Sequence, residues 1–214
     1  YLPKVPDSID WRTKGVVGPV KNQGSCVSAW AFAVAEVVKI RHAIKTGIFL
    51  PDLSPQQLVD CDTSNVGCGW GGLAHSAFQY VQRYGLMSWH DYPYVDEKQP
   101  CAYNASKVVT KINGIGVLHN EYYMRDEVGL RGPIVASLNM ANLNYYRSGI
   151  FDYPNCGSNP TQFLIIVGYG KENGLDYWIL KNSWGPAWGE HGYLRISRNR
   201  GTCGINFLVS FPKD

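Results

Sequence analysis

Long apolar runs and net charge are both scarce in this sequence. No apolar run reaches the roughly eighteen residues that a membrane-spanning helix needs, so we expect no membrane span. The formal net charge is only +3 and no block of basic residues occurs, which argues against a nucleic-acid partner. Hydrophobic residues make up 45% and charged residues 17% of the 214 residues. This composition is typical of a globular protein that buries a substantial core.

The sequence also has no unpaired cysteine to be expected, because the number of cysteines is even. The six positions are Cys26, Cys61, Cys68, Cys101, Cys156 and Cys203. Three disulfides formed in an oxidising compartment account for all of them and leave no free thiol. Zinc is the rival for Cys61 and Cys68, but neither a Cys-x-x-Cys pair nor a close pair of histidines accompanies them. We therefore expect neither a metal nor a cofactor.

A signal peptide is absent as well. The sequence starts at Tyr1 without a charged and apolar leader, so we expect a mature segment from which a leader has been removed. Asn104-Ala105-Ser106 matches the acceptor sequence for N-glycosylation at Asn104. Together with the cysteines, this predicts a secreted protein, with a lysosomal or another endomembrane location as the alternative.

The pattern of residues changes from helical to strand-like along the chain. Helices are expected over 28–46, 54–59 and 73–84, where Ser28 and Pro55 are typical of helix starts and Gly47 and Gly85 of helix ends. Short runs rich in β-branched or aromatic residues predict strands over 107–115, 134–138, 163–169, 177–181 and 193–197. Helices followed by strands indicate an α+β fold with two packed halves.

Four sequence blocks, in order along the chain, resemble the papain-like cysteine peptidases. They are residues 23–32 (QGSCVSAWAF), 53–61 (LSPQQLVDC) with the later Gly-Cys and Gly-Gly pairs at 67–68 and 71–72, 163–170 (FLIIVGYG), and 181–185 (KNSWG) with 188–190 (WGE). The cathepsin L and K branch is the most similar. The resemblance implies a papain-like fold over 1–214, with a helical half (about 1–110 plus the C-terminal tail), a β-barrel-like half (about 111–208) and a substrate cleft between them. It also implies the disulfides Cys26–Cys68, Cys61–Cys101 and Cys156–Cys203.

The reactive pair of that family is not present in this sequence. By the same resemblance, Ala29 stands at the position of the nucleophilic cysteine and Gln162 at that of the basic histidine. A methyl group cannot form a thiolate, and a carboxamide does not exchange protons near neutral pH. The resemblance implies that Asn182, Trp184 and Gln23 are the retained ring-orienting, covering and oxyanion-stabilising residues. Ser25 and Ser28 cannot replace the nucleophile without a base, and the five histidines lie outside the base block.

The expected cleft differs from the family pattern too. Val27 replaces a glycine beside the scissile bond, and Trp70 makes the segment after Cys68 one residue longer than usual. The expected cleft residues are Val27, Trp70, Gly71, Gly72, Leu73, Ala74, Phe163 and Leu208, with Leu73, Ala74, Phe163 and Leu208 in the main specificity pocket. Either these changes are neutral or they partly fill the groove with Trp70 and Phe163.

These residues favour a secreted, monomeric pseudoenzyme that acts by binding a protein such as a protease inhibitor of the cystatin type or another protease. An exposed aromatic patch would instead favour an unrelated ligand, and the side chains to inspect are Trp70, Trp89, Tyr122, Tyr123, Tyr145 and Tyr146. The enzymatic alternative is an active cysteine endopeptidase, hydrolysing peptide bonds, that was inactivated by engineering. A storage or structural role is the third interpretation.

Overall fold

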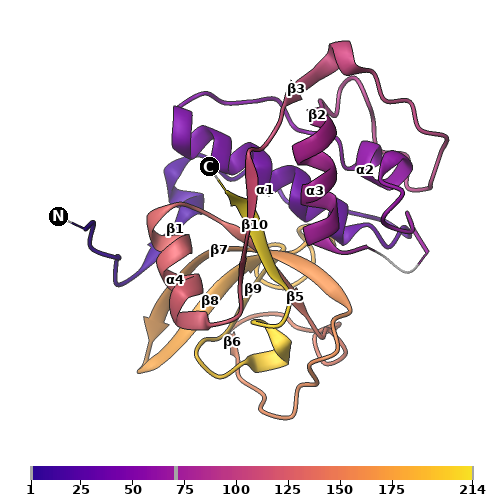
Figure 1. The fold of residues 1–214 in the computed structure, drawn as a ribbon. Coiled ribbons are helices and arrows are strands. Elements are labelled where there is room, and N and C mark those ends of the chain that lie inside the picture. Colours follow the sequence, from indigo (N-terminus) through magenta and orange to yellow (C-terminus); the bar gives the residue numbers. More distant parts are fainter. Residues whose placement is uncertain (1, 70–71, 214) are drawn as a thin grey trace. The chain divides into compact units, whose positions relative to one another are not determined.

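The computed structural model describes residues 2–69 and 72–213. The chain divides into a β-rich unit, residues 1–22 and 117–209, and a helical unit, residues 23–116 and 210–214. Figure 1 shows the helices α1, α2 and α3 in one of these units and most of the strands in the other. Residues 1–22 were expected in the helical half. They belong to the β-rich unit because β1 (Ile9–Asp10) pairs with Gly168 and Tyr169 of a long strand there.

The helical unit is built around α1 (Ala29–Thr46), which is buried on most of its faces as its apolar sequence predicts. Ser28 is its N-cap residue, and at its end the Gly47 N–H donates to the Ala43 carbonyl with Gly47 at a φ of 72°. The shorter α2 (Pro55–Cys61) is capped by Ser54, and α3 (Ala74–Tyr84) ends before Gly85. The three predicted helices are therefore confirmed.

The predicted strand over 107–115 is wrong in its extent. The structure has β3 (Val108–Thr110), which pairs with β2 (Leu86–Met87), and then a separate strand β4 (Gly114–Leu118). Between them the Asn113 carbonyl accepts a hydrogen bond from Gln82 Nε2 of α3 at 2.8 Å. This carbonyl is bound by a helix side chain rather than by a neighbouring strand, and the strand is interrupted there.

The β-rich unit is organised on the long strand β7 (Gln162–Glu172). Its neighbours are β5 (Ile134–Leu138) on one side and β8 (Leu175–Lys181) on the other, followed by β9 (Tyr193–Ser197) and β6 (Ile150–Phe151). The pairs β5–β7, β7–β8 and β8–β9 are antiparallel, whereas β6 runs parallel to β9. A helix that the sequence did not reveal, α4 (Glu121–Leu130), packs on β7.

The full strand order is β4-β10-β5-β7-β8-β9-β6, where β10 covers Val209–Lys213. Both β4 and β10 run across the division between the two units. Within the described residues no pairing joins β4 to β6, so the sheet is open. The expected α+β class is confirmed, but the expected barrel-like closure is wrong.

All six cysteines form disulfides, and the pairing is the one that the resemblance implied. Cys26–Cys68 and Cys61–Cys101 lie in the helical unit, and Cys156–Cys203 lies in the β-rich unit. Since Cys61 and Cys68 belong to two different disulfides, neither supplies a thiolate for zinc.

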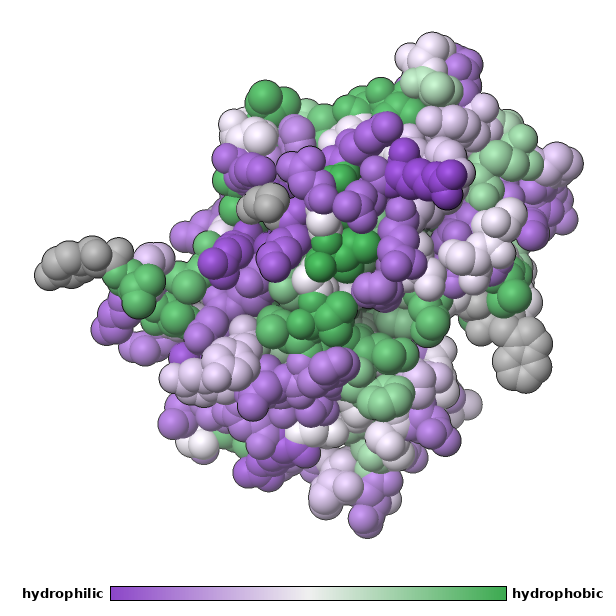
Figure 2. Space-filling view, viewed as in Figure 1, coloured by the Kyte–Doolittle hydropathy of each residue, from purple (hydrophilic) through white to green (hydrophobic). Residues whose placement is uncertain are grey.

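The surface of the protein is mixed in polarity. Figure 2 shows hydrophilic residues over much of the face in view, with smaller groups of hydrophobic residues among them. Among the described residues, no helix combines the length and the apolar character that crossing a membrane requires.

Candidate active site

The helical unit places Ala29 at the first position of α1, where the residue is 4% exposed. The turn that leads into it is fixed by the Cys26–Cys68 disulfide and by the Val27 N–H, which donates to the Cys68 carbonyl at 3.2 Å. The Val27 carbonyl in turn accepts from Trp30 Nε1 at 3.1 Å. Both the N–H and the carbonyl of Val27, two residues before Ala29, are therefore hydrogen-bonded.

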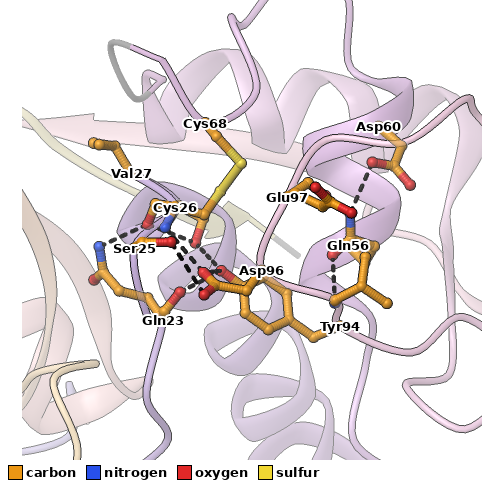
Figure 3. The surroundings of a disulfide bond; sticks show 12 residues. Gln23, Ser25, Cys26, Val27, Gln56, Asp60, Cys68, Tyr94, Asp96 and Glu97 are labelled. Carbon is orange, nitrogen blue, oxygen red and sulfur yellow. Dashed lines mark hydrogen bonds between the residues drawn. A yellow bond between two sulfur atoms is a disulfide. The ribbon is translucent and has the colours of Figure 1, made fainter.

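Asp96 organises the same turn, although no sequence motif pointed to it. Its carboxylate accepts hydrogen bonds from the Cys26 N–H at 2.9 Å and from Ser25 Oγ at 3.2 Å (Figure 3). The backbone N–H of Cys26, followed by that of Ser25, lowers the pKa of Asp96 from its ordinary value of 3.8. Glycine suits position 24 because its φ is +68°, and a Cβ there would also lie 2.5 Å from the Asp96 carboxylate oxygens, which would have to shift.

Tyr94 is the second support of this turn that the sequence did not reveal. Its hydroxyl donates to the Gln23 carbonyl and lies 2.8 Å from Ser28 Oγ. Desolvation of the phenol raises the pKa of Tyr94 to about 12, so it stays a neutral donor over the physiological pH range. Asp96 and Tyr94 are distant from the turn in sequence, and no local pattern connects them with it.

Gln23, the predicted oxyanion-stabilising residue, is buried and takes part in this turn. Its Nε2 donates to the Cys26 carbonyl at 3.2 Å, as Figure 3 shows. The side chain therefore has a structural role in the segment that precedes Ala29, whatever its part in binding.

The β-rich unit places Gln162 at the start of β7 and Asn182 just after β8. Gln162 Nε2 donates to Asn182 Oδ1 at 2.9 Å, and both side chains are buried. Asn182 Oδ1 also accepts from the Ser183 N–H at 2.8 Å. The other amide atom, Asn182 Nδ2, is buried without a hydrogen-bond partner among the described residues. The structure thus brings the two predicted residues together.

Trp184 lies in a segment that the N-terminal residues hold in place. Its ring packs edge-on against Trp188 with centroids 5.3 Å apart, and its backbone forms an isolated β-bridge with Asn22. Lys181 Nζ adds hydrogen bonds to the Gly18 and Pro19 carbonyls at 2.8 and 2.9 Å. The covering role of Trp184 over the Gln162–Asn182 hydrogen bond stays a prediction.

The predicted cleft residues of the helical unit differ in exposure. Val27 and Leu73 are 38% and 50% exposed, whereas Ala74 is fully buried. Gly72 packs so closely that a Cβ there would lie 2.6 Å from Asn65 Oδ1 and 2.7 Å from Trp30 Cδ2. Trp70 and Gly71 lie outside the described residues.

The predicted cleft residues of the β-rich unit are neighbours of Ser137 in β5. Phe163 of β7 pairs with Ser137, whose N–H donates to the Leu208 carbonyl at 3.2 Å. Phe163 and Leu208 are both half-buried. A pocket shared by these residues with Leu73 and Ala74 remains a prediction.

Comparison with known proteins identifies the family of the chain. Residues 5–213 match the model of the papain family cysteine proteases. The chain belongs to this family. It is 45% identical to mouse cathepsin K over 98% of this chain, and 46% identical to the cathepsin L-like proteinase of Phaedon cochleariae over 97% of this chain. It spans about 65% of the length of both relatives.

Solved structures of the papain family agree with the fold. The structure of digestive procathepsin L 3 from the larval midgut of Tenebrio molitor superposes with a TM-score of 0.93 at 39% identity, covering 100% of this chain and 71% of that one. The bromelain protease of Ananas comosus, in complex with the E64 inhibitor, gives a TM-score of 0.89 at 39% identity, covering 98% of this chain and 99% of that one.

Neither Ala29 nor Gln162 has a side chain suited to acid–base chemistry. Ala29 has no ionisable group, and the Gln162 carboxamide contributes an N–H donor but no basic nitrogen. His75, His90, His119 and His191 are exposed and His42 is half-buried. In the described part of the chain, no group of three or more His, Cys, Asp or Glu side chains is arranged to hold a metal ion.

Proposed function

We propose that this papain-family member is not a peptidase and acts by binding another protein. The observation that carries the proposal is that all six cysteines of the sequence are in disulfides, so that no thiol remains to act as a nucleophile. A cysteine peptidase needs a thiolate, which the family generates at a helix N-terminus beside an imidazole. The corresponding first residue of α1 is Ala29, with only a methyl group.

The residue at the base position supports the same proposal. Gln162 donates an N–H to Asn182 Oδ1, as a histidine ring held by that asparagine would do. A carboxamide has no second nitrogen that takes up a proton near neutral pH, so the proton transfers to and from a leaving amine are missing. Loss of such a nucleophile costs on the order of a million-fold in turnover, and oxyanion stabilisation alone retains roughly a thousand-fold over water.

A secreted or endomembrane location fits this proposal. Three disulfides persist in oxidising compartments and are rare in the cytosol. Asn104 is exposed, and its Oδ1 accepts from the Ser106 N–H and hydroxyl at 3.0 and 2.7 Å. An N-linked glycan at Asn104 would extend into solvent, and a mass shift of the secreted protein that disappears in the variant Asn104→Gln would demonstrate it.

The proposed partner is a protein that recognises the papain fold, either a protease inhibitor or another protease, with the chain itself monomeric. The rigid turn around Ala29 supports it, because a preorganised surface binds at a smaller entropic cost. The aromatic candidates for a different ligand divide into two groups. Tyr122, Tyr123 and Tyr145 are exposed, whereas Trp89 packs on Phe32 and Tyr146 on Trp188.

The experiment that tests the proposal is a restoration series in a peptidase assay. The unmodified protein, Ala29→Cys, Gln162→His and the double variant are compared on the same peptide substrate. We expect measurable cleavage only in the double variant, because the thiol needs the imidazole. Cleavage by Ala29→Cys alone at the rate of an active cathepsin would contradict the proposal and favour an engineered peptidase.

Binding is tested separately from catalysis. A cystatin-type inhibitor is titrated into the unmodified protein, with Val27→Gly as the variant that restores the glycine expected beside the scissile bond. Nanomolar affinity supports the binding function. Absence of binding to the inhibitor and to proteases alike would favour a storage or structural role.

A further inference from the structure

A pocket of about 430 Å³ lies in the helical unit between one side of α3 and two neighbouring segments. The residues of α3 that line it are Ser76, Gln79, Tyr80, Arg83 and Tyr84. Their spacing of i, i+3, i+4, i+7 and i+8 places them on a single side of the helix. The other wall comes from residues 61–64, Cys101 and Tyr103. The volume lies within the range of about 300–1,000 Å³ that is usual for small-molecule sites.

The walls of this pocket are held together by bonds that do not depend on a ligand. The Cys61–Cys101 disulfide joins the two segments of the wall opposite α3. The Tyr103 hydroxyl donates to the Tyr84 carbonyl at 3.1 Å, which ties this wall to the end of α3. A ligand therefore meets a preorganised surface, which lowers the entropic cost of binding.

Three tyrosine rings supply the apolar part of the pocket. The Tyr80 and Tyr84 rings are tilted by 38° with centroids 4.9 Å apart, and Tyr103 meets Tyr84 edge-on at 5.9 Å. Tyr80 is buried and its hydroxyl accepts from Gln57 Nε2 at 3.1 Å, whereas Tyr84 is 37% exposed. The Arg83 guanidinium lies over the Tyr84 ring at 5.2 Å from its centroid. The rings thus form a stiff apolar surface, because a tyrosine has only two side-chain torsions.

The polar side chains around the rings have unused hydrogen-bonding capacity. Thr63, Ser76 and Gln79 line the pocket, and none of their side chains has a hydrogen-bond partner among the described residues. Thr63 and Gln79 are exposed and Ser76 is half-buried, so all three are accessible. A hydroxyl or a carboxamide group both donates and accepts, and this rim therefore matches a ligand that does the same.

The charged side chains of the pocket balance each other. Among the described residues that line it, Asp62 carries the one negative charge and Arg83 the one positive charge. The Asp62 carboxylate already accepts from the Ser64 N–H and hydroxyl and from Asn65 Nδ2. An anionic or cationic ligand therefore gains little net attraction from the walls.

We propose that this pocket binds a neutral pyranose ring of a saccharide. A pyranose has an apolar C–H face, which suits the tyrosine rings, and hydroxyl groups that donate and accept, which suit Thr63, Ser76 and Gln79. A proline-rich peptide also packs on aromatic grooves, but its prolines offer only carbonyl acceptors and leave the acceptor atoms of this rim unused. The pocket shares no described residue with the candidate active site, so the proposal does not rest on the lack of peptidase activity.

The test is titration of the unmodified protein with methyl α-D-mannopyranoside, methyl β-D-galactopyranoside and N-acetyl-D-glucosamine, followed by saturation-transfer NMR. We expect saturable binding of at least one of them, with a millimolar dissociation constant because a single ring makes few contacts. Tyr84→Ala removes an exposed ring and should weaken this binding by about tenfold or more. Tyr84→Phe is the matched control, since it keeps the ring and should leave the affinity within about twofold.

A second pair of variants tests the polar rim at positions where the fold is not disturbed. Gln79→Ala removes an exposed carboxamide that has no partner among the described residues, and it should weaken binding by about fivefold. Gln99→Ala removes an exposed carboxamide that does not line the pocket, and it should leave the affinity within about twofold.

The variant Asn104→Gln distinguishes the source of the sugar. Asn104, the acceptor of the proposed glycan, directly follows Tyr103 of the pocket wall. Tighter binding by Asn104→Gln than by the unmodified protein identifies the chain's own glycan as the occupant, and equal binding identifies a separate saccharide. The proposal is overturned if none of the three sugars binds saturably to either protein, including the case in which an oligoproline peptide binds instead. It is equally overturned if Tyr84→Ala binds the sugar as tightly as Tyr84→Phe does.

Discussion

The turn before Ala29 and the start of β7 at Gln162 differ in how much peptidase chemistry their side chains can supply. Ala29 supplies none, whereas Gln162 still donates an N–H to Asn182. Both segments nevertheless retain dense hydrogen bonding, through Asp96 in the helical unit and through Asn182 in the β-rich unit. Asp96 and Asn182 both accept hydrogen bonds from backbone N–H groups. These hydrogen bonds do not involve the side chains at positions 29 and 162, so they can persist when those positions carry no reactive group.

The largest expected effect comes from removing one disulfide in each unit. The pairs Cys26–Cys68 and Cys156–Cys203 are separated by 42 and 47 residues in sequence. Chain-entropy arguments predict a loss of about 3–4 kcal/mol in the free energy of unfolding for either double Cys→Ser variant. Urea denaturation measures both. A loss below about 1 kcal/mol for only one pair would show that the two units depend on their disulfides unequally.

The second prediction concerns how much the Gln162–Asn182 hydrogen bond in the β-rich unit contributes to stability. Asn182→Ala removes the acceptor of two buried donors, Gln162 Nε2 and the Ser183 N–H, and should cost about 2 kcal/mol in the free energy of unfolding. Gln162→Ala and the double variant complete a mutant cycle with an expected coupling of about 1 kcal/mol. Strict additivity would mean that the hydrogen bond contributes nothing to stability.

The equivalent test in the helical unit uses two glycines. Gly72→Ala would place a Cβ 2.6 Å from Asn65 Oδ1 and 2.7 Å from Trp30 Cδ2, which should destabilise the protein by about 1–2 kcal/mol. The matched control is Gly69→Ala, where the nearest atom lies 3.8 Å away and the change should stay within about 0.5 kcal/mol. Equal melting temperatures for the two variants would contradict the close packing at Gly72.

The smallest expected effect concerns pH. The pKa of Asp96 is lowered in the folded state from 3.8 by the N–H groups that it accepts from, so its stabilising contribution is present above that value. The contribution disappears as the pH falls through the lower folded pKa. Comparison of the unmodified protein with Asp96→Asn by thermal denaturation should therefore show a difference above pH 4 that shrinks in stronger acid. A difference independent of pH would rule out a role for the carboxylate charge.

The sequence predicted the elements with strong local patterns. The strands β5 and β9 cover the expected residues 134–138 and 193–197, and α1 follows the expected N-cap at Ser28. The helix α4 was missed because its sequence, EYYMRDEVGL, is rich in polar residues and contains Gly129. The assignment of residues 1–22 failed because it depends on pairing with a strand more than a hundred residues away.

The candidate site was predictable only where a motif carried it. Ala29 and Asn182 were found because they stand within sequence blocks, and Gln162 because it directly precedes one. The structure brings Gln162 and Asn182 into contact. Asp96 and Tyr94 have no such block. Their role arises from hydrogen bonds to a turn some seventy residues earlier, as in the contact of Asp96 with Cys26, and only tertiary structure creates it.

The central claim is tested most directly on the unmodified protein. A thiol-reactive active-site label and a peptide-hydrolysis assay are applied together, without reductant and then after denaturation under non-reducing conditions. We expect no labelled cysteine in either state, because all six are in disulfides, and no hydrolysis above the uncatalysed rate. A labelled thiol in the folded protein accompanied by turnover that the label abolishes would contradict the account.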